Sequence, residues 1–170
     1  MEQQAAQGLI GVFVVLPTEE KMMNMDIPYA DYILLLQQWE IPQSSLGKVC
    51  PGIYKPNEFN RNPNFFTING KDFSDTTPLY TMYVEKIRIR FINKSSNSHS
   101  MHIHGHDFVV VAVNGFSRKG FDDTIDVASG RRIDIEFLSN NPGIWPVNGT
   151  KTFYQSNNRE SPDVMITRLI

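Results

Sequence analysis

The sequence has only one cysteine, Cys50, among its 170 residues, so no disulfide bond can form within the chain. It also lacks a surplus of either charge: 16 Lys and Arg residues stand against 18 Asp and Glu residues. Without a basic surplus or a block of like charges, nothing indicates binding to nucleic acid or to an anionic membrane surface. No apolar run reaches the roughly 20 residues that a membrane-spanning helix needs. The opening Met1-Glu2-Gln3-Gln4 lacks the basic and apolar regions of a signal peptide.

Histidines are present in one place only. All 4 of them lie in the stretch His99-Ser100-Met101-His102-Ile103-His104-Gly105-His106. On an extended strand, side chains at i, i+2 and i+4 point to one face, so His102, His104 and His106 are expected to lie together. Neutral imidazole is a common ligand of copper, zinc, iron and nickel, so the stretch predicts a metal-binding surface. The alternatives are a chance cluster, a tag-like segment, or one histidine hydrogen-bonded in a core.

Short apolar segments separated by Gly, Asn and Pro turns fill most of the chain. Expected strands lie at residues 8–16, 31–39, 65–71, 83–92, 101–113, 131–138 and 164–169, with turns at 69–70 and 114–115. Residues 83–92 and 131–138 alternate polar and apolar side chains, as half-buried strands do. A helix is the open alternative for residues 31–39. This pattern, with no convincing long helix, predicts an all-β sandwich or barrel.

The histidine stretch, with the strand at residues 86–93 before it and Asp107-Phe108 after it, resembles the copper-binding signature of multicopper oxidases. The resemblance continues through residues 66–70, 123–125, 128–130 and 141–145. Multicopper oxidases are built from cupredoxin domains, so the resemblance implies an all-β, cupredoxin-like Greek-key sandwich or barrel. It also implies copper as the cofactor. Three imidazoles without a thiolate or carboxylate suit zinc as well, so zinc is the substitute considered.

The resemblance assigns a role to each candidate metal-ligating residue. His99 matches the type 1 copper ligand, His102 the type 2 ligand and His104 a type 3 ligand. His106 has no direct ligand role in the family pattern, and a role behind the ligands or in packing is expected for it. It is therefore the last of the four candidates.

The chain departs from the family pattern after the Gly-x-Trp turn. The family shows His-Cys-His there, whereas this chain reads Trp145-Pro146-Val147-Asn148-Gly149-Thr150, and no histidine or cysteine follows His106. Cys50 matches no family position. Oxidase activity is therefore not expected of the isolated chain.

The resemblance implies a half-site whose remaining ligands come from another cupredoxin domain or subunit, in a parent protein that oxidises a substrate and reduces dioxygen. A homo-oligomer is one such arrangement. The alternatives are a degenerate, non-catalytic cupredoxin that binds a single copper or zinc ion, or a structural or assembly module. Residues 1–16 are interpreted as the last strand of a preceding cupredoxin domain or an N-terminal extension. Residues 17–60 are interpreted as a linker and first strand, and residues 61–170 as the cupredoxin domain.

Overall fold

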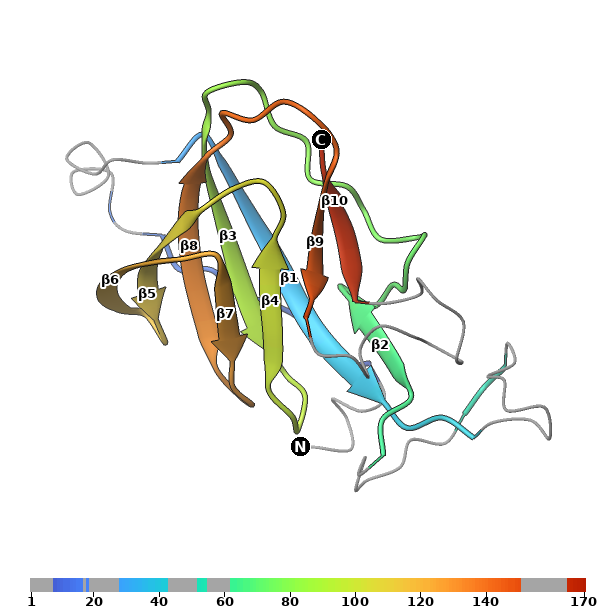
Figure 1. Cartoon of the computed structure of the whole chain (residues 1–170). Helices are drawn as coiled ribbons and strands as arrows, with labels where there is room; N and C mark the ends of the chain where they lie inside the picture. The colour runs from blue at the N-terminus through green and yellow to red at the C-terminus, as the bar shows by residue number, and fades with distance from the viewer. Residues whose placement is uncertain (1–7, 17, 19–27, 43–51, 55–61, 151–164) are drawn as a thin grey trace.

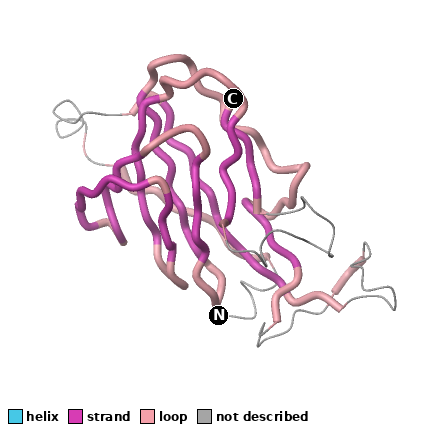
Figure 2. The backbone as a smooth tube through the Cα atoms, viewed as in Figure 1, coloured by secondary structure: helices cyan, strands magenta, loops and turns pink. Residues whose placement is uncertain are grey.

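The computed structural model describes residues 8–16, 18, 28–42, 52–54, 62–150 and 165–170. Those residues form strands and loops but no helix (Figure 1, Figure 2), so the predicted all-β fold is confirmed. Accordingly, none of the described residues belongs to a helix that is long and apolar enough to cross a membrane. The strands are β1 (Ala30–Trp39), β2 (Phe65–Ile68), β3 (Lys86–Asn93), β4 (His99–Ile103), β5 (Phe108–Val113), β6 (Phe116–Asp122), β7 (Thr124–Val127), β8 (Arg132–Leu138), β9 (Trp145–Gly149) and β10 (Ile166–Leu169).

The larger sheet has six strands in the order β2-β1-β3-β8-β5-β6. Within it β1 pairs antiparallel with β2 and parallel with β3. Residues 31–39 therefore form the predicted strand, and the helix alternative is wrong. The expected domain boundaries assign β1 to residues 17–60, and both of its partners lie within residues 61–170.

The smaller sheet has four strands in the order β10-β9-β4-β7, and all of its neighbours are antiparallel. It contains β4, which carries the first histidines, and β9, which follows the Gly-x-Trp turn. β4 lies between β9 and β7, so its side chains have a neighbouring strand on each side. The smaller sheet is therefore the one that positions the candidate metal ligands.

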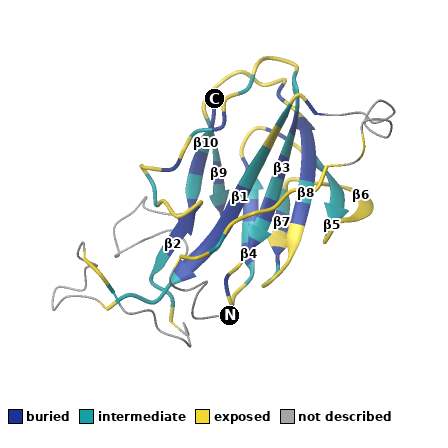
Figure 3. Ribbon diagram, turned by 180° about the vertical axis from the view of Figure 1, so that it is seen from behind, coloured by how far each residue is buried: buried dark blue, intermediate teal, exposed yellow. Residues whose placement is uncertain are grey.

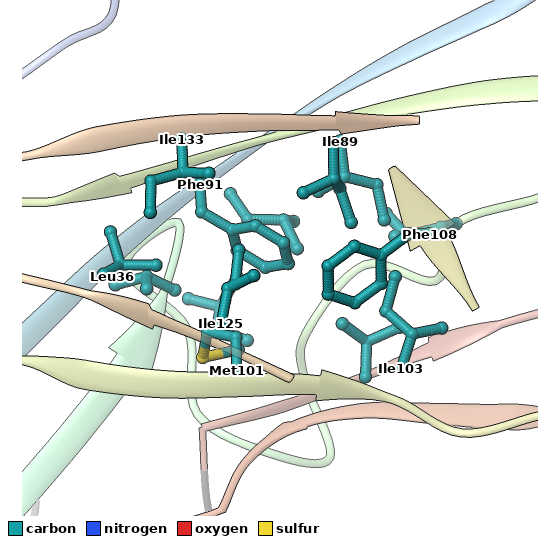
Figure 4. Packing of buried hydrophobic residues seen from close by; sticks show 14 of the residues in the cluster. Leu36, Ile89, Phe91, Met101, Ile103, Phe108, Ile125 and Ile133 are labelled. Atoms are coloured by element: carbon teal, nitrogen blue, oxygen red, sulfur yellow. The ribbon is translucent and has the colours of Figure 1, made fainter. Parts of the chain in front are cut away.

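The apolar faces of the two sheets meet in one core. In β3 the buried side chains alternate with half-buried ones, as the sequence pattern predicts. Figure 4 shows side chains from both sheets pointing toward one another, among them Ile89 and Phe91 of the larger sheet and Met101 and Ile103 of the smaller one. Each large side chain buried in this way stabilises the fold by about 1.5–3 kcal/mol. Figure 3 shows dark blue, buried stretches in β1 and β8 of the larger sheet, whereas β6 is exposed along its whole length.

The opposite face of the larger sheet carries a ladder of ion pairs. Arg90 bonds to Asp31 through two nitrogens, at 2.8 and 2.7 Å, and to Asp134 at 2.8 Å. Arg88 and Lys86 both contact Glu136 one step along the ladder. Burial raises the pKa of Asp134 above its ordinary value, although Arg90 opposes this shift. The hydrogen bond to Asp31 is the main reason why the pKa of Arg90 is raised.

Two strand predictions are wrong. Residues 8–16 form no strand, and Leu9, Phe13 and Val15 are exposed. A strand needs a neighbour to satisfy its backbone groups, and none of the described strands pairs with this segment. The predicted single strand at 101–113 is in fact two strands, β4 and β5, which belong to different sheets.

Candidate metal centre

The histidines of β4 point to opposite faces of the smaller sheet. His99 shares the buried face with Met101 and Ile103, whereas His102 lies on the other face, because side chains alternate along a strand. On that second face, His102 pairs with Thr124 of β7 on one side and with Asn148 of β9 on the other. Any metal ion at His102 is therefore approached from outside the sandwich rather than from its core.

The side chain of His102 is oriented by the backbone of the neighbouring strand. Its Nδ1 lies 2.6 Å from the carbonyl oxygen of Asp123 and 3.2 Å from the hydroxyl of Thr124. A carbonyl oxygen can only accept, so Nδ1 carries the proton and donates it. The other ring nitrogen, Nε2, then keeps its lone pair, which is the arrangement that metal-binding histidines commonly show.

His104 lies beside His102. β4 ends at Ile103, and the His104 N–H then donates to the Pro146 carbonyl at 3.0 Å. The two imidazole rings meet edge to face, with centres 4.6 Å apart and planes at 73°. Nε2 of His104 lies 3.0 Å from the side-chain oxygen of Asn148. The structure thus brings His102 and His104 together, as the i, i+2 spacing predicts.

His106 does not join this pair, so the prediction that three histidines share one face is wrong for it. Gly105 has a φ of 72°, a left-handed conformation that turns the chain away from the line of β4. The His106 ring is buried, packs on Phe137 and Trp145, and donates from Nδ1 to the His104 carbonyl at 3.2 Å. Its Nε2 is buried and has no hydrogen-bond partner among the described residues.

His99 is completely buried. Its Nε2 lies 2.8 Å from the hydroxyl of Ser95, and its ring meets Phe66 edge to face at 6.5 Å. A type 1 copper site needs a second histidine and a cysteine thiolate beside such a ring. The sequence has no histidine or cysteine after His106, and Cys50 lies outside the described residues. The residues present therefore do not fit a type 1 site.

The pair of His102 and His104 does fit part of a copper or zinc site. A metal–nitrogen bond is about 2.0–2.1 Å and a ring centre lies about 1.2 Å further out, so two imidazoles at roughly 90–109° on one ion have centres about 4.5–5.3 Å apart. The observed 4.6 Å falls within that interval. No group of three His, Cys, Asp or Glu side chains suited to a metal occurs among the described residues. The pair therefore amounts to half a site.

Asn148 is the site residue that the sequence did not single out. It stands in the stretch where the family pattern has His-Cys-His, and the pairing of β9 with β4 brings it to His102 and His104. An asparagine between turn residues gives no indication in the sequence that it lies next to a metal-binding histidine. Only the pairing of β9 with the histidine strand reveals it.

Comparison with known proteins places the chain in a family. The family model described as multicopper oxidase matches residues 50–158. Laccase-3 of Thanatephorus cucumeris is 32% identical over 153 residues, which cover 82% of this chain and 26% of that protein. Multicopper oxidase MmcO of Mycobacterium tuberculosis is 29% identical over 90 residues, which cover 53% of this chain and 18% of that protein. The chain thus spans about a quarter or less of the length of these relatives.

A solved structure supports the same fold. The blue copper oxidase from Nitrosomonas europaea superposes with a TM-score of 0.69 at 24% identity, over 91% of this chain and 46% of that one. The two packed sheets are accordingly those of a cupredoxin-like domain, as the sequence predicts. With the family model matching more than half of the residues, the chain belongs to the multicopper oxidase family.

Proposed function

We propose that this chain supplies a His-x-His half-site, His102 and His104, to a copper centre that another cupredoxin domain or a second subunit completes. In the parent protein that centre takes part in oxidation of a substrate coupled to reduction of dioxygen. The observation that carries the proposal is the edge-to-face pair of imidazoles, 4.6 Å apart, with Nδ1 of His102 held by a backbone carbonyl.

The two histidines have separate roles in this proposal. His102 would bind through Nε2, because its Nδ1 proton is donated to Asp123 and Thr124. His104 would bind from the turn that follows β4, where its backbone is fixed by Pro146 and His106. Copper bound there would supply one-electron chemistry toward dioxygen. The chain's own contribution is to hold two imidazole side chains next to each other at the end of β4.

His99 and His106 take supporting positions. His99 lies on the buried face and has no thiolate near it in the sequence pattern, so a type 1 role would need ligands from elsewhere. His106 faces Phe137 and Trp145 rather than the pair, which supports a role behind the ligands. Zinc remains a substitute for copper, since two imidazoles suit either ion.

Copper analysis of the purified chain tests the proposal. After growth in copper-supplemented medium, we expect bound copper with a type 2 EPR spectrum and no intense blue absorption band. The double variant His102→Ala with His104→Ala should lose that copper, whereas Asp126→Ala, an exposed residue of the neighbouring β7, should keep it. Protein that refuses copper, or a double variant that retains it, would refute the assignment.

The degenerate alternative, a cupredoxin that binds a single copper or zinc ion without turnover, is favoured by one observation. Asn148 already bonds to His104, at a position where the family pattern has a histidine-cysteine-histidine run. Sedimentation with and without copper separates the two proposals. A half-site completed by a second subunit should make the chain associate when copper is added. A copper site formed within one chain should leave the sedimenting mass unchanged.

A further inference from the structure

Asn148 is bonded to one ring nitrogen of His104. From this we propose that Asn148 decides which nitrogen of His104 can bind a metal: it holds the ring in the Nε2–H form, so that His104 offers Nδ1 while His102 offers Nε2. Asn148 is thus a specificity-determining residue of this pair. The metal-bound part of this inference rests on the proposed function, whereas the protonation of the free rings does not.

The orientation of the Asn148 amide follows from its second bond. Its Nδ2 donates to the carbonyl oxygen of Gly149 at 3.0 Å. Turning the amide over would place two oxygen acceptors against each other, so Oδ1 must be the atom that faces His104. Because Oδ1 can only accept, the bond of 3.0 Å requires a proton on Nε2 of His104. A neutral ring with that proton has its lone pair on Nδ1.

His104 cannot easily turn away from this arrangement. Its backbone N–H donates to Pro146 at 3.0 Å, and its carbonyl accepts from Nδ1 of His106 at 3.2 Å. The next residue, Gly105, is held by Asn141, whose Nδ2 donates to the Gly105 carbonyl at 3.0 Å. With the backbone fixed on both sides, the position of the ring depends on its own side-chain torsions and on Asn148.

The neighbouring ring is held in the opposite form. Nδ1 of His102 carries its proton toward the Asp123 carbonyl at 2.6 Å, which leaves Nε2 as the donor atom. Two histidines two residues apart therefore present different nitrogens. For a metal ion to use Nε2 of His104 instead, the bond to Asn148 must break and the proton must move to Nδ1. That bond is worth roughly a 2- to 10-fold change in an equilibrium.

Long-range proton–nitrogen NMR of the ¹⁵N-labelled full chain tests the inference directly. In metal-free protein we expect His104 to be protonated at Nε2 and His102 at Nδ1. One equivalent of Zn²⁺ should then shift the Nδ1 resonance of His104 and the Nε2 resonance of His102. Two variants isolate Asn148. Asn148→Asp keeps an acceptor of the same size and should keep the proton pattern of the metal-free protein, whereas Asn148→Leu removes the acceptor and should move zinc toward Nε2 of His104.

The outcomes separate this inference from the proposed function. Zinc on Nε2 of His104 in the wild type, or an Asn148→Leu variant with the wild-type pattern, overturns the role of Asn148. If neither ring responds to zinc or copper, the proposed function fails, and the metal-free spectra still decide whether Asn148 fixes the proton. The wild-type spectra suffice for that decision even where the leucine variant does not fold.

Discussion

Gly105 and Trp145 are in such close contact that any side chain at position 105 would force the indole ring to shift. A Cβ atom on Gly105 would lie 2.8 Å from the indole ring of Trp145, and the Gly105 backbone has a φ of 72°. The indole is itself fixed, because its Nε1 donates to the carbonyl of Asn141 at 2.8 Å. The turn between His104 and His106 is therefore built around this contact.

Gly105→Ala should destabilise the protein. The added methyl group meets Trp145 and also strains the left-handed backbone, so we expect a loss of about 2–4 kcal/mol in the free energy of unfolding, measured with urea. Gly130→Ala is the matched control, because Gly130 has a φ of 69° and nothing within 4 Å of its Cβ position. That variant should lose only about 1 kcal/mol. Equal losses would show that the Trp145 contact is unimportant.

His106→Phe should weaken copper binding while leaving the fold in place. The phenyl ring fits between Phe137 and Trp145 and removes a buried nitrogen without a described partner, but it deletes the bond to the His104 carbonyl. Loss of a group that holds a ligand typically costs 10- to 100-fold in metal affinity, so we expect a fall of about tenfold. Competition with a copper chelator measures it. Phe137→Leu, which alters the same packing without touching His104, should leave affinity unchanged.

Arg90→Met should destabilise the larger sheet more than a surface substitution does. Arg90 neutralises both Asp31 and Asp134, and its removal leaves two carboxylates on one face of the sheet with the weaker influence of Arg88 and Arg132. Because the arginine side chain is 19% exposed, we expect a loss of about 1–3 kcal/mol in the free energy of unfolding. Combining Arg90→Met with Asp31→Asn should recover part of the loss. A loss below about 0.5 kcal/mol would contradict this role.

Asp134 should make stability depend on pH. Burial raises its folded-state pKa above the unfolded value of about 4, so the folded protein binds this proton more readily. The resulting stability is present below the unfolded pKa and is lost as the pH rises through the folded pKa. Relative to the wild type, Asp134→Asn should therefore gain stability as the pH is raised from about 3 to 7.

The same pH series in an Arg90→Met background is the control for Asp134. Arg90 lowers the pKa of Asp134, so its removal should enlarge the shift and steepen the difference between the aspartate and asparagine proteins. Unfolding in urea at each pH gives both curves. A difference of the opposite sign would mean that the ion pair, rather than burial, controls Asp134.

Much of the fold could be predicted where side chains alternate. Ile87, Ile89 and Phe91 mark β3 as a strand with one buried face, and the structure confirms this. β6 could not be predicted in the same way, because it has no buried side and therefore no apolar alternation. The segment at 8–16 shows the opposite failure. It has the composition of a buried strand, but pairing depends on a neighbour that composition does not reveal.

The candidate site was predictable for two histidines and not for the rest. The spacing of His102 and His104 suffices to place them together, since His104 continues the alternation of β4 one residue beyond its last residue, Ile103. His106 is displaced by the turn at Gly105. A glycine within a run of histidines does not by itself predict a residue with a left-handed backbone conformation. Asn148 is 44 positions from its partner His104 in the sequence, and strand pairing alone joins them.

The parallel pairing of β1 with β3 has a consequence for how the chain reaches this structure. Ala30 of β1 pairs with Ile87 of β3, so the intervening segment must close before the centre of the larger sheet can form. Closing a loop of this length costs conformational entropy before the strand contacts form. Proteins dominated by pairings between distant residues therefore fold in milliseconds to seconds. β3 and β8 lie nearer in sequence and can pair first. Until β1 pairs with it, β3 keeps an unpaired edge that is open to other chains.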